Sequence, residues 1–213
     1  MNFAQTRISA RAVALFVGMI AAALPLLAQP TRARAGMMYA ATTGGTLYSV
    51  NPNTVVTTLV GPLVTPSSTP AFQFTSSLAF DNSGTLWGLD GDTGVVGSIN
   101  TSTGVTTILN PTPSVPGGFI SGITFDPGSG ALIASDEGNG SLYSVSLVTG
   151  NYTLLGNMGM NASGIQFTPD GKLYAVAYGV GNIIQIDHHF MDQDMRQSLS
   201  YARIRCWRVP GCR

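Results

Sequence analysis

Charged residues are scarce in this 213-residue sequence: Asp, Glu, Lys and Arg together make up 9%, against about 25% in an average globular protein. Residues 36–187 contain no His, no Cys and a single Lys, Lys172. This segment therefore lacks the near-neutral base on which Ser-His-Asp and Cys-His nucleophile systems depend. Schiff-base chemistry would have to use Lys172. The low charge and a hydrophobic content of 44% argue against a disordered chain, and the many Gly, Thr and Ser residues argue against a helical protein.

The formal net charge of zero is the sum of three unlike segments. Residues 1–35 carry four Arg and no acid, residues 36–187 carry Lys172 against eight acids, and residues 188–213 carry five Arg and two Asp. With both ends set aside, the remaining protein is acidic. Such a composition suits a binding scaffold better than a catalyst.

The N-terminus has the pattern of an export signal. Arg7 and Arg11 precede an apolar run over residues 12–28, and Ala-Arg-Ala at residues 33–35 supplies small residues before a cut at Gly36. The end of the apolar run is a second candidate cut. An uncleaved membrane anchor is the alternative, but the run is short for a spanning helix and contains Gly and Pro. We predict a signal peptide over residues 1–35, a secreted or periplasmic protein, and no stable membrane span after cleavage.

The middle of the chain repeats a strand-turn-strand motif. It appears as SLAFDNSGTLW at residues 77–87, GITFDPGSGALI at residues 122–133 and GIQFTPDGKLY at residues 164–174. The Phe residues of successive copies are 45 and 42 positions apart. An apolar residue and Phe stand two apart on one face of each strand, and Asp, Pro and Gly supply the turn.

A second motif follows each copy of the first and predicts a β-hairpin. It appears as LYSVNPNTVVTTL at residues 47–59, VGSINTSTGVTTI at residues 96–108 and LYSVSLVTGNYTL at residues 142–154. A fourth copy begins at residues 183–187 and then stops matching. Each copy has an alternating strand, a turn rich in Asn or containing Thr-Gly, and a Thr-rich outer strand.

Four short strands in each unit of 41–49 residues predict an all-β protein made of β-propeller blades, because a single such sheet cannot bury both faces alone. The first unit begins at its second strand and the last ends at its third. We therefore expect three, four, four and three strands, which is about 3.5 blades and an incomplete ring. The predicted domain of repeats covers residues 36–187.

The signatures SLAFDNSGTLWGLD and LYSVSLVTGNYTLLG resemble those of exported bacterial propeller repeats, including NHL-like, lactonase-like and streptogramin lyase-like groups. The resemblance covers residues 38–187 and implies the architecture. It does not imply one activity, because these groups include binders, lyases and hydrolases. Streptogramin lyase-like propellers use a catalytic His, and residues 36–187 contain none.

Acidic residues gather in two equivalent turns of neighbouring units. Asp90 and Asp92 lie in one turn, and Asp136 and Glu137 lie in the next. If these turns converge, their oxygen atoms would suit Ca²⁺, so we predict these four residues as metal ligands. The alternative is that Asp, Asn and Gly simply form tight hairpin turns.

Two other groups of residues have structural interpretations. Asp81, Asp126 and Asp170 fall in the turns between first and second strands, where turn chemistry accounts for them. Aromatic residues occupy one position of the second strand, where packing between blades is favoured over a ligand platform. These aromatic residues are Tyr39, Trp87 and Tyr174.

Residues 188–213 do not continue the repeat and contain both His and both Cys of the chain. We predict that the reading frame was lost near residue 187, which leaves an out-of-frame or disordered tail; a genuine C-terminal extension is the alternative. Cys206 and Cys212 would pair in an oxidising compartment. The His and Cys spacings fit no usual zinc site. The Arg residues around Trp207 form too small a patch to indicate nucleic acid.

The sequence leaves three interpretations of function. The first is an exported propeller that acts as a binding or interaction scaffold for a protein, glycan or small ligand, without a cofactor. The second is a metal-dependent propeller hydrolase or lyase that holds calcium at the four turn acids. The third is a truncated fragment without function, whose exposed edge strands would aggregate.

Overall fold

The computed structural model describes residues 36–115, 117–179 and 181–186, together with the backbone of residues 204–206. The chain divides into two compact units, residues 1–36 and 37–213, and nearly all described residues belong to the second. The predicted signal peptide lies outside the described residues, as does most of the predicted tail. Of the predicted disulfide, Cys212 lies outside them and only the backbone of Cys206 is described, so this pairing stays a prediction.

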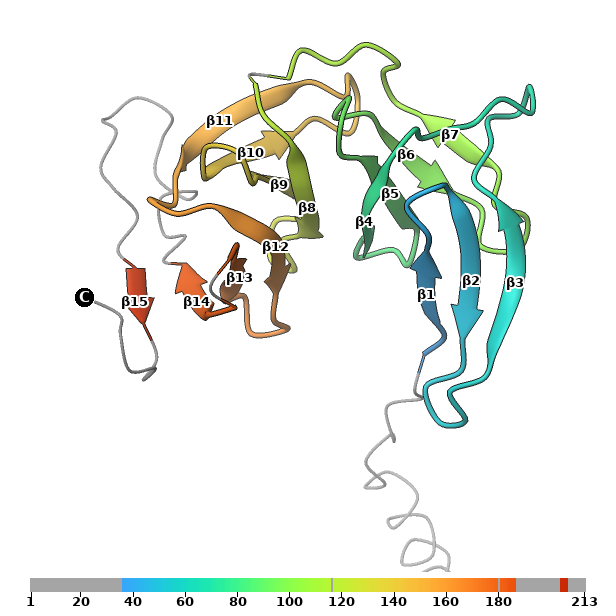
Figure 1. Ribbon diagram of the computed structural model, residues 1–213, viewed down its shortest axis with the longest axis horizontal. Helices are drawn as coiled ribbons and strands as arrows, with labels where there is room; N and C mark the ends of the chain where they lie inside the picture. Colours follow the sequence, from blue (N-terminus) through green and yellow to red (C-terminus); the bar gives the residue numbers. More distant parts are fainter. Residues whose placement is uncertain (1–35, 116, 180, 187–203, 207–213) are drawn as a thin grey trace, which may run out of the picture. The chain divides into compact units, whose positions relative to one another are not determined.

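Within the described residues the chain forms fifteen strands and no helix, grouped into four antiparallel sheets (Figure 1). The first sheet has three strands and each of the others has four, always in chain order. The first two sheets contain β1 (Met38–Ala41), β2 (Thr46–Val50), β3 (Thr57–Pro62), β4 (Thr75–Phe80), β5 (Leu86–Asp90), β6 (Val96–Ile99) and β7 (Thr106–Ile108). The last two contain β8 (Ile120–Phe125), β9 (Leu132–Asp136), β10 (Ser141–Val145), β11 (Tyr152–Asn157), β12 (Ala162–Phe167), β13 (Leu173–Ala177), β14 (Ile183–Ile186) and β15 (Ile204–Cys206).

The predicted fold class, an all-β protein of antiparallel propeller blades with an incomplete set of strands, is confirmed. The expectation of three strands in the last sheet was wrong, because β15 pairs with β14 and supplies a fourth. The sequence of β15, Ile-Arg-Cys, lacks the Thr-rich alternation of the other outer strands, so the repeat pattern did not predict it. That the tail follows a lost reading frame stays a prediction.

Aromatic side chains pack between consecutive sheets at equivalent positions. Tyr39 of β1 contacts Phe80 of β4 with 5.8 Å between ring centroids, and Trp87 of β5 contacts Phe125 of β8 with 6.1 Å. The prediction that aromatic residues at this position pack between blades is therefore confirmed for the first two sheets. Tyr174, at the same position in the last sheet, has no following sheet beside it in the described part of the chain.

Serine residues at β-bulges link consecutive sheets by hydrogen bonds. The pairing register of β4 with β5 shifts at Ser76, and that of β8 with β9 shifts at Ser121. The Ser76 hydroxyl donates to the carbonyl of Ile120 in the next sheet at 3.1 Å, and Ser121 donates to Ala162 at 2.6 Å. A bulge turns its side chain away from the sheet's regular alternation, which here directs each hydroxyl to the neighbouring sheet.

Three strands of the two middle sheets are covered on both faces. Every residue of β5, β8 and β9 is buried, although side chains of a strand alternate between faces. The reason is that β8 lies against both β4 and β12, so the third sheet is enclosed by its neighbours. These strands nevertheless contain buried polar residues, which are Asp90, Ser121, Thr124, Ser135 and Asp136.

Candidate functional site

The β5–β6 and β9–β10 turns each begin with a buried aspartate, Asp90 and Asp136. Oδ1 of Asp90 accepts hydrogen bonds from the N–H groups of the second and third residues after it, both at 3.0 Å. Oδ1 of Asp136 accepts the same two hydrogen bonds, at 2.7 and 3.3 Å. A glycine closes each turn in the left-handed region, Gly94 with φ of 69° and Gly140 with φ of 72°. Both aspartates thus shape their turns, as the alternative interpretation of the sequence expected.

The second carboxylate oxygen distinguishes the two turns. Oδ2 of Asp90 accepts hydrogen bonds from the N–H groups of Gln73 and Phe74, at 2.5 and 3.3 Å. Oδ2 of Asp136 is fully buried and has no hydrogen-bond partner among the described residues. Gly118 packs so closely against this carboxylate that a Cβ atom on it would lie 2.2 and 2.3 Å from the two oxygens. On this side the carboxylate of Asp136 is therefore held by packing and not by hydrogen bonds.

Backbone hydrogen bonds join the two turns at one end of neighbouring sheets. The N–H of Ile120 donates to the carbonyl of Gly91 at 3.0 Å, and the N–H of Glu137 donates to the carbonyl of Phe119 at 2.9 Å. The rings of Phe74 and Phe119 meet edge to face with 5.5 Å between centroids. The two turns and this half-buried aromatic pair therefore form one continuous region.

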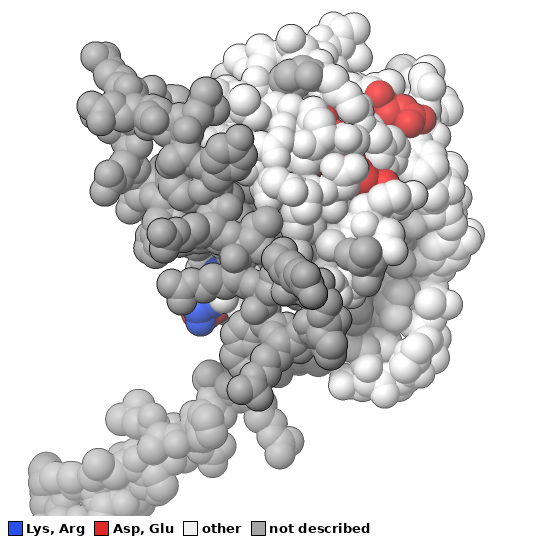
Figure 2. Space-filling view, turned by 60° about the vertical axis from the view of Figure 1, so that its left-hand side comes forward, with Lys and Arg blue, Asp and Glu red and all other residues white. Residues whose placement is uncertain are grey.

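We define the turn surface as the accessible part of this region. It consists of Asp92, Thr93, Gly138 and Asn139, which are exposed, and Glu137, which is half-buried. On the face drawn in Figure 2, most of the described surface is uncharged and acidic groups occupy small areas. On this face the acidic side chains are therefore separate features on an uncharged surface and do not form a broad acidic field.

Tyr152 of β11, in the third sheet, forms a hydrogen bond with the β5–β6 turn. Its hydroxyl donates a hydrogen bond to the carbonyl of Gly94 at 2.7 Å. Burial, together with the nearby carboxylate of Asp90, raises the pKa of the Tyr152 hydroxyl. The hydroxyl therefore stays protonated at neutral pH and remains a donor to the turn.

Metal binding at the turn acids stays a prediction. Asp90 and Asp136 direct Oδ1 at the backbone of their own turns. Among the described residues, no three His, Cys, Asp or Glu side chains come together as a metal site requires. Ca²⁺ takes six to eight oxygen ligands, so a site here would need backbone carbonyls or water beside the turn acids.

The aromatic pair beside the turns was not predicted from the sequence. Phe74 and Phe119 are 45 residues apart, the same spacing as Phe80 and Phe125 of the repeated strands. Each precedes the first residue of an inner strand, β4 or β8. This shared period was the signal that could have placed them in the repeat.

At the opposite end of the second sheet, the Asp81 carboxylate fastens the β4–β5 turn. It accepts hydrogen bonds from the Ser83 hydroxyl at 2.7 Å, the Thr85 N–H at 2.8 Å and the Trp87 indole N–H at 3.0 Å. Partial burial raises the pKa of Asp81, but these hydrogen bonds outweigh it and lower the pKa to about 2. The ionised carboxylate is thus part of the folded turn.

Replacing Asp81 with Asn should make the protein less sensitive to acid. The folded pKa of about 2 is below the usual value of about 3.9, so the stabilisation is present above pH 4 and is lost as the pH falls toward 2. We expect D81N to lower the free energy of unfolding by about 1–2 kcal/mol at pH 7, after allowance for solvent screening, and much less at pH 2. Urea unfolding at both pH values measures this. The exposed Asp92→Asn is the control, and an equal loss for D81N at both pH values would contradict the argument.

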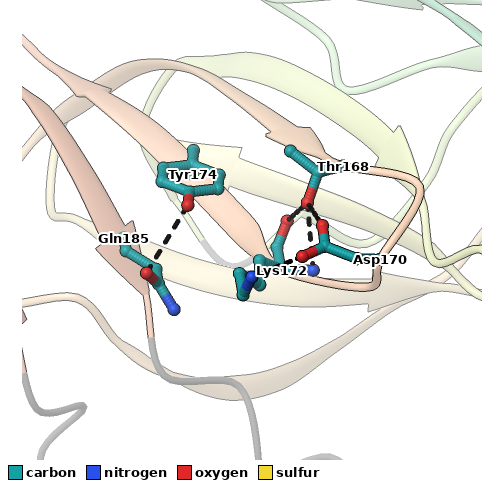
Figure 3. A network of polar contacts seen from close by, with 5 residues as sticks. All are labelled: Thr168, Asp170, Lys172, Tyr174 and Gln185. Atoms are coloured by element: carbon teal, nitrogen blue, oxygen red, sulfur yellow. Dashed lines mark hydrogen bonds and ion pairs between the residues drawn. The ribbon is translucent and has the colours of Figure 1, made fainter.

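Lys172, the one lysine of the repeats, forms an exposed ion pair with Asp170 (Figure 3). The Thr168 hydroxyl also donates to Asp170, at 2.5 Å. The hydrogen bond to Asp170 raises the pKa of Lys172, and the same hydrogen bond lowers the pKa of Asp170. Lys172 is therefore protonated at neutral pH, which does not suit a Schiff-base nucleophile.

The chain matches a family model described as "Repeat of unknown function (DUF6923)" over residues 7–159. No curated protein matches the sequence. Within the described residues, none forms a helix with the length and hydrophobicity needed to span a membrane. The family match thus rests on most of the predicted repeats.

Several solved structures share the fold at low sequence identity. An auxiliary nutrient binding protein from Bacteroides ovatus ATCC 8483 is 17% identical, with a TM-score of 0.57 over 85% of this chain and 42% of its own. Virginiamycin B lyase from Staphylococcus aureus is 18% identical, with a TM-score of 0.52 over 85% of this chain and 55% of its own. A chain of a nidogen/laminin complex is 18% identical, with a TM-score of 0.55 over 79% and 60%. This chain spans about two fifths to three fifths of these structures, and the similarity shows the fold alone.

Proposed function

Because the chain belongs to the family of repeats of unknown function DUF6923, we propose that it is a binding scaffold whose ligand contacts the turn surface. The observation that carries this proposal is the rigid end of the second and third sheets. This end contains two turns that are stabilised by aspartate hydrogen bonds, and an edge-to-face aromatic pair and exposed polar side chains lie beside them. Apolar rings flanked by a few fixed polar groups are the usual chemistry of ligand recognition.

The names of two similar structures agree with this proposal. One is an auxiliary nutrient binding protein, and another is part of a nidogen/laminin complex. A protein, glycan or small ligand would each fit the mixture of aromatic, amide and carboxylate groups. Export to the periplasm or the medium belongs to the same proposal and is supported by the basic and apolar N-terminus.

A binding screen with matched variants tests the proposal. Wild-type protein is applied to an array of neutral and acidic oligosaccharides and to laminin as a protein probe. The turn variant Asp92→Ala/Glu137→Ala should weaken the binding of any hit at least about tenfold, since buried or flanking polar contacts of this kind are each worth about 1 kcal/mol or more. The control Asp170→Ala removes an exposed acid at the opposite end of the sheets. Equal binding by all three proteins would place the ligand elsewhere and overturn the proposal.

The metal-dependent hydrolase or lyase has one observation in its favour, which is the buried Oδ2 of Asp136 without a donor. Calorimetric titration with Ca²⁺ tests it. Binding heat accompanied by a higher melting temperature would support this second function, and the absence of both would remove it. A non-cooperative, aggregated protein would instead support the interpretation as a fragment without function.

A further inference from the structure

The last sheet exposes a position that is buried in every other sheet. Ile183 pairs with Val176 in the register that Leu47, Val96 and Leu142 occupy in the first three sheets. Ile183 is 63% exposed, whereas each of the other three is 5% exposed or less. The difference arises from the surroundings, since all four are large aliphatic residues in the same place of the same repeat.

At the three buried positions, the side chain belongs to an apolar cluster shared with the next sheet. In each cluster it packs with the first residue of the second strand of the next sheet, and these first residues occupy equivalent positions in the repeat. The shared clusters contain Leu47 with Leu86, Val96 with Leu132, and Leu142 with Leu173. Ile183 therefore faces the place where a following sheet would pack.

The first sheet exposes the complementary position. Met38 is the register equivalent of Leu86, Leu132 and Leu173, because each pairs with the last residue of the following strand. Met38 is 55% exposed, while the other three are 2% exposed or less. Leu59 in β3 is also largely exposed, and it pairs with Tyr48 of β2. The chain thus presents, on its first and last sheets, the two halves of an interface that it forms internally between consecutive sheets.

A hydrogen-bonding group on the last sheet also lacks its usual partner. Ser163 occupies the bulge of β12, as Ser76 and Ser121 occupy those of β4 and β8. Those two serines donate to a carbonyl of the next sheet, but the contact of Ser163 is to Val176 of its own sheet, at 3.4 Å. The last sheet therefore presents both a polar group, the Ser163 hydroxyl, and an apolar group, Ile183, that contact a following sheet at the equivalent positions of the other sheets.

Charged residues are few in the two outer sheets: the strands of the last sheet contain one, Arg205 of β15, which pairs with Gln185. Residues 36–80, which include the whole first sheet, contain no charged residue. On the last sheet, Tyr174 and Gln185 form a polar contact at 3.5 Å, and the Asp170–Lys172 pair lies at the turn (Figure 3). Depletion of charge in the middle with polar groups nearby is the composition found in protein interfaces.

We propose that the last sheet of one copy packs against the first sheet of a second copy, head to tail. A second copy is the occupant that these observations favour, because it covers both the Ile183 and the Met38 faces with one repeated contact. The first sheet already stacks on the second sheet although it has only three strands, so a missing fourth strand does not prevent the contact. Interfaces of this kind join two different faces and close into rings or extend into filaments.

Sedimentation velocity on the purified full chain tests the proposal. We expect wild-type protein to self-associate reversibly as its concentration rises. Ile183→Asp or Met38→Asp should each weaken association by about tenfold or more, because an unpaired charge enters an apolar contact. Val148→Asp, which changes an exposed residue of the β10–β11 turn, is the matched control and should associate like wild type. A wild-type protein that is monomeric at every concentration would overturn the proposal and leave both faces to other partners.

Mixing the two variants tests the head-to-tail arrangement itself. M38D retains an intact Ile183 face and I183D retains an intact Met38 face, so an equimolar mixture should form a heterodimer more strongly than either variant associates alone. An interface made of the same face on both copies gives no such rescue. Variants that remain monomeric in the mixture, or that associate as well as wild type when alone, would contradict the proposal.

Discussion

Gly118→Ala is expected to lower the free energy of unfolding by about 2–4 kcal/mol, the sum of backbone strain and overpacking. Gly118 has φ of 62°, and its Cβ atom would overlap both carboxylate oxygens of Asp136. Asp136 is fully buried, so its side chain cannot rotate into solvent to make room. Chemical denaturation of the variant and wild type measures the loss.

Two further variants separate the overlap from the backbone strain. Gly171 has φ of 78° and nothing within 4 Å of an added Cβ, so Gly171→Ala should show strain alone, about 1 kcal/mol. In the Asp136→Ala background, which removes the carboxylate, Gly118→Ala should likewise lose only the strain component. Equal losses for G118A and G171A would show that the contact with Asp136 does not matter.

Leu142→Ala should destabilise the protein by about 2–5 kcal/mol, as expected for a buried leucine in a packed cluster. Leu142 of β10 is buried with Ile165 and Leu173 of the next sheet, so the substitution opens a cavity between two sheets. Leu154 of the adjacent strand β11 is 52% exposed, and Leu154→Ala removes the same atoms from the same sheet. We expect a change within about 0.5 kcal/mol for this control.

Thermal or urea unfolding of both leucine variants measures the contrast. A two-state transition for wild type would allow the two losses to be compared directly. If L142A unfolds at the same denaturant concentration as L154A, the third and fourth sheets do not pack as described.

The repeat predicted most of the fold because its residues recur at fixed positions. Phe80, Phe125 and Phe167 mark equivalent strands, and Tyr39 and Trp87 pack between sheets as expected from their shared position. The strand β15 was not predicted because its three residues carry none of the repeat's Thr-rich pattern. Secondary structure in such a segment comes from pairing with β14 and not from local preference.

The candidate site was predicted less completely than the strands. Asp90 and Asp136 were recognised as equivalent turn residues. Whether Oδ2 of each carboxylate accepts a hydrogen bond, however, depends on segments outside the turns. Gln73 and Gly118 directly precede the equivalent residues Phe74 and Phe119, so the sequence aligns them, but it does not show that the N–H of Gln73 reaches Asp90 while Oδ2 of Asp136 stays without a donor among the described residues. A long-range contact of this kind requires the folded chain.

The serines at the β-bulges have a consequence for how such a chain changes in evolution. Each contact between sheets uses one hydroxyl and one carbonyl at the same two positions, at Ser76 with Ile120 and again at Ser121 with Ala162. A duplicated or deleted segment of one full period therefore brings together surfaces that already match, whereas a segment of any other length does not. Unequal recombination in whole periods can thus alter the copy number without requiring a new interface.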